Sequence, residues 1–122
     1  MNNPVNWFEI YVQDMDRAKI FYEAVFGWRL SKLEGSEFDM WAFPMSQGKA
    51  GATGALIKIP GYPSGNNSVV IYFSCDDCAV EANKATLAGG KIETEKKLVG
   101  PYGCITLVND TEGNVIGLHS MK

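Results

Sequence analysis

Three cysteines and a single histidine are the side chains best suited to redox or metal chemistry in this sequence. Cys75 and Cys78 form a C-x-x-C pair at the point where a β-rich run gives way to a helix-like segment. Dithiol redox proteins place their reactive pair at such a point, because a helix N-terminus favours the thiolate. Asp76 and Asp77 lie between the two cysteines and oppose a further negative charge. A zinc site would need more ligands, of which Cys104 is one candidate.

Composition and charge restrict the class of protein. The 122 residues suit one domain, and 46% hydrophobic with 20% charged residues is ordinary for a globular protein. The net charge is −3, and Lys96-Lys97 is the only basic doublet, which argues against nucleic-acid binding. No apolar run approaches the ~18 residues of a membrane span, and the N-terminus does not resemble a secretory signal. Three cysteines form no disulfide framework, so we expect a cytoplasmic protein that binds neither nucleic acid nor membrane.

Two segments of the chain resemble each other and indicate how the elements are ordered. Residues 7–28 and 69–90 each begin with a β-rich run, continue through an acidic residue into a helix-like stretch and end at a glycine. An aspartate caps a helix N-terminus, and a glycine can take the left-handed conformation that ends it. Two pairs of landmarks are each separated by 62 residues: Asp14 and Asp76, and Gly27 and Gly89.

Short strands are expected after each of the two helices. They are predicted at 28–33, 38–44 and 52–59, and again at 91–97, 103–108 and 115–120, with a hairpin turn at 110–114. Each copy is then a βαβββ module, and a unit of this size buries too little core to fold alone. The prediction is an α+β fold in one domain over 1–122, with module one at 1–60, a breaker-rich linker at 60–67 and module two at 68–122.

Three runs of sequence carry a family signal. The first is residues 12–18, followed by Phe21-Tyr22 and Phe26-Gly27-Trp28; the second is residues 72–77; the third is the ending at 109–118, in which Thr111 replaces a proline. Together they resemble the glyoxalase/bleomycin-resistance/extradiol-dioxygenase (vicinal oxygen chelate) superfamily over essentially the whole chain. The resemblance implies paired βαβββ modules whose sheets curl around a cup, and a homodimer.

The resemblance also indicates where a metal would bind. In metal-using members, each module offers a His or similar ligand on its first strand and a Glu on its last strand. The matching positions here are Trp7 and Val69 on the first strands, and Ala55 and Gly117 on the last strands. None of these side chains can bind a metal. The usual quartet of ligands is therefore expected to be missing, which leaves the cofactor unknown, with a divalent metal still open.

Two ionisable side chains share the concave face with the metal-ligand positions. Alternate residues of a strand share a face, so Glu9 and Tyr11 accompany Trp7, and His119 accompanies Gly117. Glu9 and His119 are the candidate catalytic groups, acting as base and acid or binding a polar ligand. The alternative is structural: Glu9 pairs with a basic residue, and His119 lies in water at the sheet edge.

Aromatic residues supply the candidate ligand-binding surface. Trp7, Tyr11 and Trp41 would form a wall for a flat organic molecule, although aromatic residues also serve as core.

Three hypotheses remain for the function. The chain is a glyoxalase-like enzyme, a lyase or isomerase acting on a small molecule; or a non-catalytic protein that binds drug-like small molecules, as in the bleomycin-resistance branch; or a dithiol redox protein using Cys75 and Cys78. The sequence leaves open whether it is an enzyme.

Overall fold

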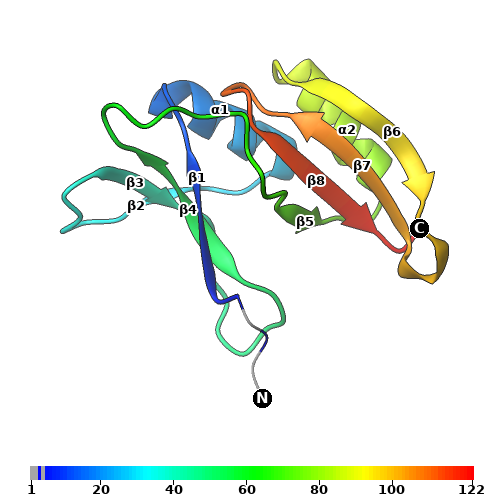
Figure 1. Ribbon diagram of the computed structural model, residues 1–122. Coiled ribbons are helices and arrows are strands. Elements are labelled where there is room, and N and C mark those ends of the chain that lie inside the picture. Colours follow the sequence, from blue (N-terminus) through cyan, green and yellow to red (C-terminus); the bar gives the residue numbers. More distant parts are fainter. Residues whose placement is uncertain (1–2, 4) are drawn as a thin grey trace.

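Two four-stranded sheets and two helices make up the fold of the computed structural model, which describes residue 3 and residues 5–122 (Figure 1). The first half contains β1 (Trp7–Tyr11), α1 (Met15–Phe26), β2 (Ser31–Lys32), β3 (Asp39–Ala42) and β4 (Thr53–Lys58). The second half contains β5 (Tyr72–Ser74), α2 (Cys78–Leu87), β6 (Lys91–Leu98), the short 3₁₀ helix η1 (Gly100–Tyr102), β7 (Cys104–Asn109) and β8 (Val115–Ser120). The predicted α+β class is confirmed.

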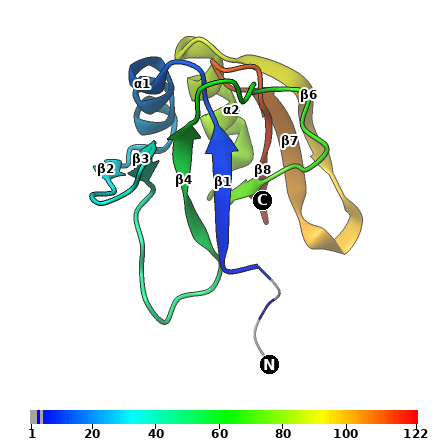
Figure 2. The ribbon, with the colours of Figure 1, turned by 60° about the vertical axis from the view of Figure 1, so that its left-hand side comes forward.

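Both sheets share one topology. The strand order is β1-β4-β3-β2 in the first sheet and β5-β8-β7-β6 in the second. In each sheet the first strand pairs in parallel with the last, and the remaining pairs are antiparallel. The two sheets lie side by side, with α1 and α2 in contact with each other (Figures 1 and 2). Among the described residues, no helix has the length and apolar character needed to cross a membrane.

The helix caps correct the predicted repeat by one residue. Asp14 accepts a hydrogen bond from the Arg17 amide at 3.0 Å, and Asp77 accepts one from the Ala79 amide at 3.1 Å. These N-caps are 63 residues apart, not 62. The strand predicted from Val69 starts only at Tyr72, so Val69 lies before β5 and is not on a first strand. Asp76 and Asp77 were both candidate caps in the sequence, and the structure uses Asp77.

One core joins the two halves of the chain. The buried face of α1 presents Phe21, Tyr22 and Val25, each 0% exposed, to a cluster that also contains Phe73 of β5 and Leu118 of β8. The Tyr22 and Phe73 rings have centroids 6.1 Å apart. The helix of the first half therefore stabilises the sheet of the second half, which is what two small modules need in order to bury enough apolar surface.

Candidate functional site

One face of β1 carries three of the candidate site residues. Ile10 is 7% exposed and lies in the core, whereas Trp7, Glu9 and Tyr11 lie on the opposite face of the strand. The Trp7 indole Nε1 donates a hydrogen bond to Glu9 Oε2 at 3.1 Å. In the parallel ladder Glu9 is the neighbour of Ala55, whose small side chain leaves space on this face. The strand thus presents a carboxylate between two aromatic rings.

A cavity of about 350 Å³ lies next to Glu9 and Tyr11. Residues 63–69 form one wall and residues 114–116, where β8 begins, form another. Asn67 links the first wall to the second through two hydrogen bonds, both at 3.2 Å. Its Oδ1 accepts from the Val115 amide, and its Nδ2 donates to the Val115 carbonyl. The segment between the two sheets is therefore an ordered wall of this cavity.

Aromatic stacking holds Tyr62, the residue that directly precedes the wall formed by residues 63–69. The Tyr62 ring stacks on the Tyr11 ring, with centroids 5.8 Å apart and planes inclined by 10°. The Gln13 side-chain amide donates to the Tyr62 carbonyl at 3.0 Å. Tyr62 itself is 55% exposed. The stacking fixes the orientation of the Tyr11 ring, which lines the cavity.

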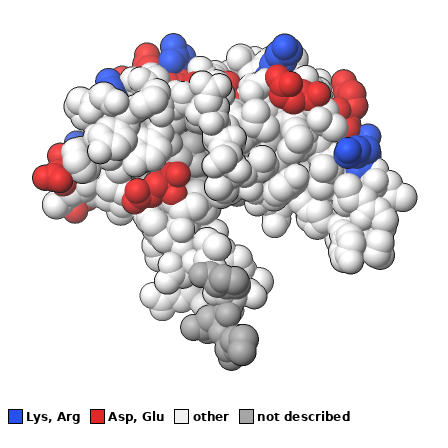
Figure 3. Space-filling model, viewed as in Figure 1, with Lys and Arg blue, Asp and Glu red and all other residues white. Residues whose placement is uncertain are grey.

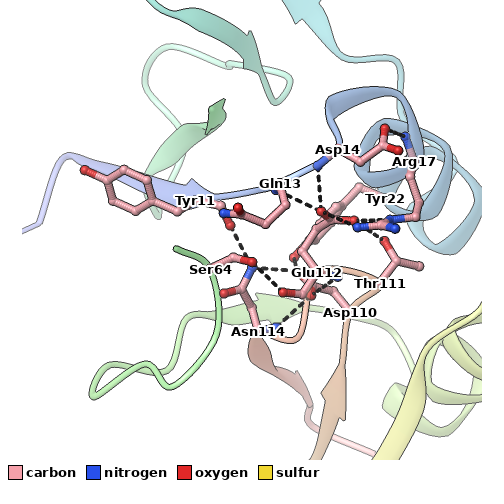
Figure 4. A network of polar contacts seen from close by, with 10 residues as sticks. All are labelled: Tyr11, Gln13, Asp14, Arg17, Tyr22, Ser64, Asp110, Thr111, Glu112 and Asn114. Atoms are coloured by element: carbon pink, nitrogen blue, oxygen red, sulfur yellow. Dashed lines mark hydrogen bonds and ion pairs between the residues drawn. The ribbon is translucent and has the colours of Figure 1, made fainter. Parts of the chain in front are cut away.

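A buried network of polar groups holds the closing hairpin against α1 (Figure 4). Glu112, whose side chain is 0% exposed, accepts hydrogen bonds from the backbone amides of Gln13 and Asp14, each at 2.9 Å. The same carboxylate forms an ion pair with Arg17, Nε to Oε2 at 2.7 Å. Burial alone would raise the pKa of Glu112, but the bonds from Arg17 and the two amides lower it to about 2.

Asn114 links this network to the cavity (Figure 4). Its Nδ2 donates to the Tyr11 carbonyl at 2.9 Å and to Asp110 at 3.0 Å, and its Oδ1 accepts from the Gly65 amide at 2.7 Å. The buried Tyr22 hydroxyl donates to Asp110 Oδ2 at 2.7 Å. Burial raises the pKa of Asp110, and the pKa of Tyr22 rises well above its ordinary value through burial and the nearby Asp110 charge. One amide side chain thus holds β1, the cavity wall and the hairpin together.

His119 lies in a second cavity, of about 390 Å³. Its Nε2 is 2.5 Å from the Tyr102 carbonyl oxygen, so this nitrogen carries the proton and donates it. Tyr72, Ser74 and Ile105 line the same cavity, and Glu9 does not. The structure therefore places Glu9 and His119 in separate cavities and does not bring the predicted pair together.

The positions that supply metal ligands in the superfamily are filled differently here. A Cβ atom added to Gly117 would lie 2.3 Å from the Tyr72 ring, so this ring covers the glycine. Trp7 and Ala55 carry no metal-binding atoms at the matching places. Among the described residues, no group of three or more His, Cys, Asp or Glu side chains could hold a metal. Trp7, Ala55 and Gly117 thus offer no metal-binding side-chain atom at the positions that the resemblance indicates.

Trp41 lies away from the other predicted ligand-binding residues. Its ring packs against the core, and the Lys19 Nζ of α1 lies 3.2 Å from the ring centroid. Its indole nitrogen donates to Asp39 at 3.1 Å. Trp41 is therefore on the helix side of the sheet, opposite Trp7 and Tyr11. The prediction missed this because the face of Trp41 follows from the strand pairing, in which Trp41 is the neighbour of Leu56 of the core.

The cysteines have the properties of structural thiols. All three are free, and Cys78 is 0% exposed. Burial raises the pKa of the Cys75 thiol to about 12, and the Glu81 carboxylate adds to the shift. A redox cysteine needs a lowered pKa, so these surroundings disfavour the dithiol hypothesis.

Sequence reasoning also missed functional positions. It treated residues 60–67 only as a linker, whereas residues 63–69 line the cavity beside Glu9. The adjacent asparagines Asn66 and Asn67 were the available signal, because asparagine side chains readily bond to nearby backbone. Asn114 was assigned to a turn, and nothing in the sequence showed that its amide reaches β1.

Comparisons with known proteins place this arrangement in a family. The model of the Glyoxalase/Bleomycin resistance protein/Dioxygenase superfamily matches residues 5–118. A Mycobacterium bovis protein named "Putative glyoxylase CFP32" is 29% identical over 113 residues, which are 92% of this chain but only 42% of that relative. The chain thus spans less than half of the relative's length.

Solved structures share the fold. A glyoxalase/bleomycin resistance protein/dioxygenase family enzyme from Burkholderia phytofirmans PsJN has a TM-score of 0.75 at 16% identity, over 96% of this chain and 98% of that one. TnmS3, described as an antibiotic binding protein from Streptomyces sp. CB03234, has a TM-score of 0.68 at 24% identity, over 98% and 96%. The chain belongs to the Glyoxalase/Bleomycin resistance protein/Dioxygenase superfamily.

Proposed function

We propose that this protein binds a small organic molecule in the cavity beside β1, without forming a covalent bond to it. The observation that carries the proposal is the cavity of about 350 Å³ that adjoins Glu9 and Tyr11 and is walled by residues 63–69. Its size falls in the range of about 300–1,000 Å³ typical of small-molecule sites. Tyr11 supplies aromatic surface to this cavity, and Glu9 supplies a polar group that the hydrogen bond from Trp7 orients.

The relatives support the same class of function. TnmS3 is described as an antibiotic binding protein and shares this fold. Fold similarity alone does not transfer a ligand. The proposal for this chain therefore depends on its own cavity, and the relative shows only that the architecture accommodates small-molecule binding.

Screening by NMR tests the proposal. Flat aromatic compounds are added to ¹⁵N-labelled protein, and the backbone amide shifts are mapped. We expect shifts to concentrate at Glu9, Asn67 and Val115, and to be lost on Tyr11→Ala. Trp41→Phe is the matched control, because Trp41 lies on the opposite face of the first sheet and its loss should leave binding intact. Shifts that cluster elsewhere would refute the site.

A glyoxalase-like lyase or isomerase activity is the second candidate. It is favoured by the relative named as a glyoxylase and by the Glu9 carboxylate, which could act as a general base on a bound substrate. His119 would act in a second cavity and so could not complete an acid–base pair within this one. The test is turnover of the hemithioacetal of methylglyoxal and glutathione, with and without added zinc, nickel, manganese or iron(II). Activity abolished by Glu9→Gln would favour this candidate over simple binding.

We also propose that the protein acts as a homodimer in the cytoplasm. Several large apolar side chains are more than two-thirds exposed on the single chain, including Leu98, Tyr102 and Met121, at 71%, 73% and 70%. Charged side chains lie mostly along the rim in the view of Figure 3, and much of the centre of that face carries none. The three free cysteines suit a reducing compartment. Light scattering after size exclusion should give twice the mass of 13.4 kDa, and a mass of one chain would overturn the dimer.

A further inference from the structure

The cavity beside β1 carries charge of only one sign. Its lining includes the Glu9 carboxylate together with apolar, hydroxyl and amide side chains, and none of its described lining residues is Lys, Arg or His. Other cavities of the molecule differ. The one beside residues 44–53 includes Lys49, and the one at the start of α1 includes Lys58 with three aspartates. A ligand in the cavity beside β1 therefore meets a carboxylate without a compensating cation.

We propose that this cavity selects an organic cation, such as a protonated amine or amidinium joined to an apolar or aromatic group, with Glu9 as its counter-ion. The inference rests on the proposed binding function and adds the charge class of the ligand. An ammonium or amidinium group has only donors, and the cavity offers acceptors to match: the Glu9 carboxylate, the Asn66 amide oxygen and the Ser68 hydroxyl. Charge-assisted hydrogen bonds of this kind are among the strongest that a site can form.

The orientation of Glu9 supports this role. Trp7 donates to Oε2, which holds the carboxylate in one position on the face of β1. Among the described residues, Oε1 receives no such hydrogen bond. Glu9 also forms no ion pair with any described lysine or arginine; the two ion pairs join Arg17 to Glu112 and Lys96 to Asp77. The carboxylate is thus positioned but not neutralised.

Aromatic surface beside the carboxylate favours the same class of ligand. Tyr11 lines the cavity and is held by stacking on Tyr62. The negatively polarised face of a tyrosine ring attracts a cation, and its apolar area covers an aromatic or alkyl tail. An anion of the same size would meet the same Tyr11 ring but would be repelled by Glu9.

Three probes of matched size and different charge test the inference: phenethylamine as the cation, 2-phenylethanol as the neutral form and 3-phenylpropionate as the anion. Each is titrated at pH 7 into ¹⁵N-labelled protein while the amide shifts of Glu9, Asn67 and Val115 are followed. We expect the cation to bind about tenfold more tightly than the anion, in line with the strength of a charged hydrogen bond. Glu9→Gln should remove this preference for the cation over the anion.

The thermal midpoint of Glu9→Gln checks that the variant keeps the fold. Glutamine keeps a carbonyl oxygen that can accept the Trp7 hydrogen bond, and Glu9 is exposed, so the thermal midpoint should not move. Glu34→Gln removes an exposed carboxylate from outside the cavity and should leave all three affinities unchanged. Equal binding of the three probes, unaffected by Glu9→Gln, would overturn the cation inference and leave the proposed binding function standing. Absence of binding by every probe up to about 10 mM would count against both.

Discussion

At the scale of single residues, Glu112 contributes more to the structure than its place in a surface hairpin suggests. Its carboxylate satisfies two backbone amides that lead into α1, and it pairs with Arg17. Both bonds go to a charged acceptor, and a hydrogen bond to a charged group contributes about 1.5–3 kcal/mol. Glu112 of the closing hairpin therefore stabilises the chain that leads into the helix of the other half.

Replacing Glu112 by Gln should lower stability in a pH-dependent way. At pH 7 we expect a loss of about 2 kcal/mol, because the charged hydrogen bonds are weakened while one acceptor remains. The pKa of Glu112 is lowered from 4.5 to about 2 in the folded protein. Its stabilisation is therefore complete above the ordinary pKa and is lost as the pH falls from about 4.5 towards about 2.

Urea unfolding of both proteins at pH 7, 5, 4 and 3 checks this expectation. The difference between wild type and Glu112→Gln should be constant from pH 7 to 5 and should shrink below that. Asp110 has the opposite effect on the pH dependence of stability. Burial raises its pKa, so its charged form is disfavoured in the folded protein. It is present in both proteins, so the difference between them reports chiefly the titration of Glu112. A difference that grows on acidification would contradict the assignment of Glu112.

At the scale of elements, a glycine on the last strand faces an aromatic residue of the first strand in each sheet. Gly54 of β4 is the neighbour of Phe8, and Gly117 of β8 is the neighbour of Tyr72. The two glycines are needed for different reasons. A Cβ at Gly54 would lie 2.1 Å from the Phe8 carbonyl oxygen, whereas the three atoms nearest to a Cβ at Gly117 all belong to the Tyr72 ring.

Alanine substitutions should separate these two cases. Gly54→Ala forces the backbone of β1 and β4 apart, so we expect a cost of about 3 kcal/mol. Gly117→Ala requires only that the Tyr72 ring, which is 48% exposed, moves aside, and we expect less than about 1 kcal/mol. Urea denaturation measures both values. Equal losses would show that the Tyr72 ring cannot move from its place over β8.

The elements were largely predictable from the sequence, and the register was not. The N-cap Asp14, the stop at Gly27 and the hairpin before β8 follow from local chemistry, so both helices and most strands were predicted in place. The sequence left Asp76 and Asp77 both open as the cap of the second helix, and the structure uses Asp77. The start of the strand before this helix was predicted at Val69, three residues earlier than β5 begins.

The candidate site was predictable only in part, for a related reason. Alternation along β1 sufficed to place Trp7, Glu9 and Tyr11 on one face, since neighbours within one strand need no tertiary information. Whether Glu9 meets His119 depends on how the two sheets lie relative to each other. Which face of the sheet Trp41 occupies depends on the register of β3. Contacts such as that of Asn114 with β1, 103 residues apart in sequence, leave no local pattern.

At the scale of the whole molecule, the shared core predicts that the two modules unfold together. Trp7, Trp28 and Trp41 all lie in the first module, so tryptophan fluorescence reports on that module, whereas circular dichroism reports on both. Because α1 contacts α2 and its Tyr22 and Phe26 rings lie against Phe73 of β5, loss of either module exposes the core of the other. The two signals should therefore give one coincident transition in urea.

Tyr22→Phe sharpens this test, because it removes a single hydrogen bond that joins the modules. The hydroxyl donates to Asp110 inside the core, and its loss should cost about 1–2 kcal/mol without creating a cavity. If the modules form one cooperative unit, fluorescence and circular dichroism midpoints should fall by the same amount. A fluorescence midpoint that falls below that of circular dichroism would instead show that the first module unfolds alone, and that the Tyr22–Asp110 bond couples two separable units.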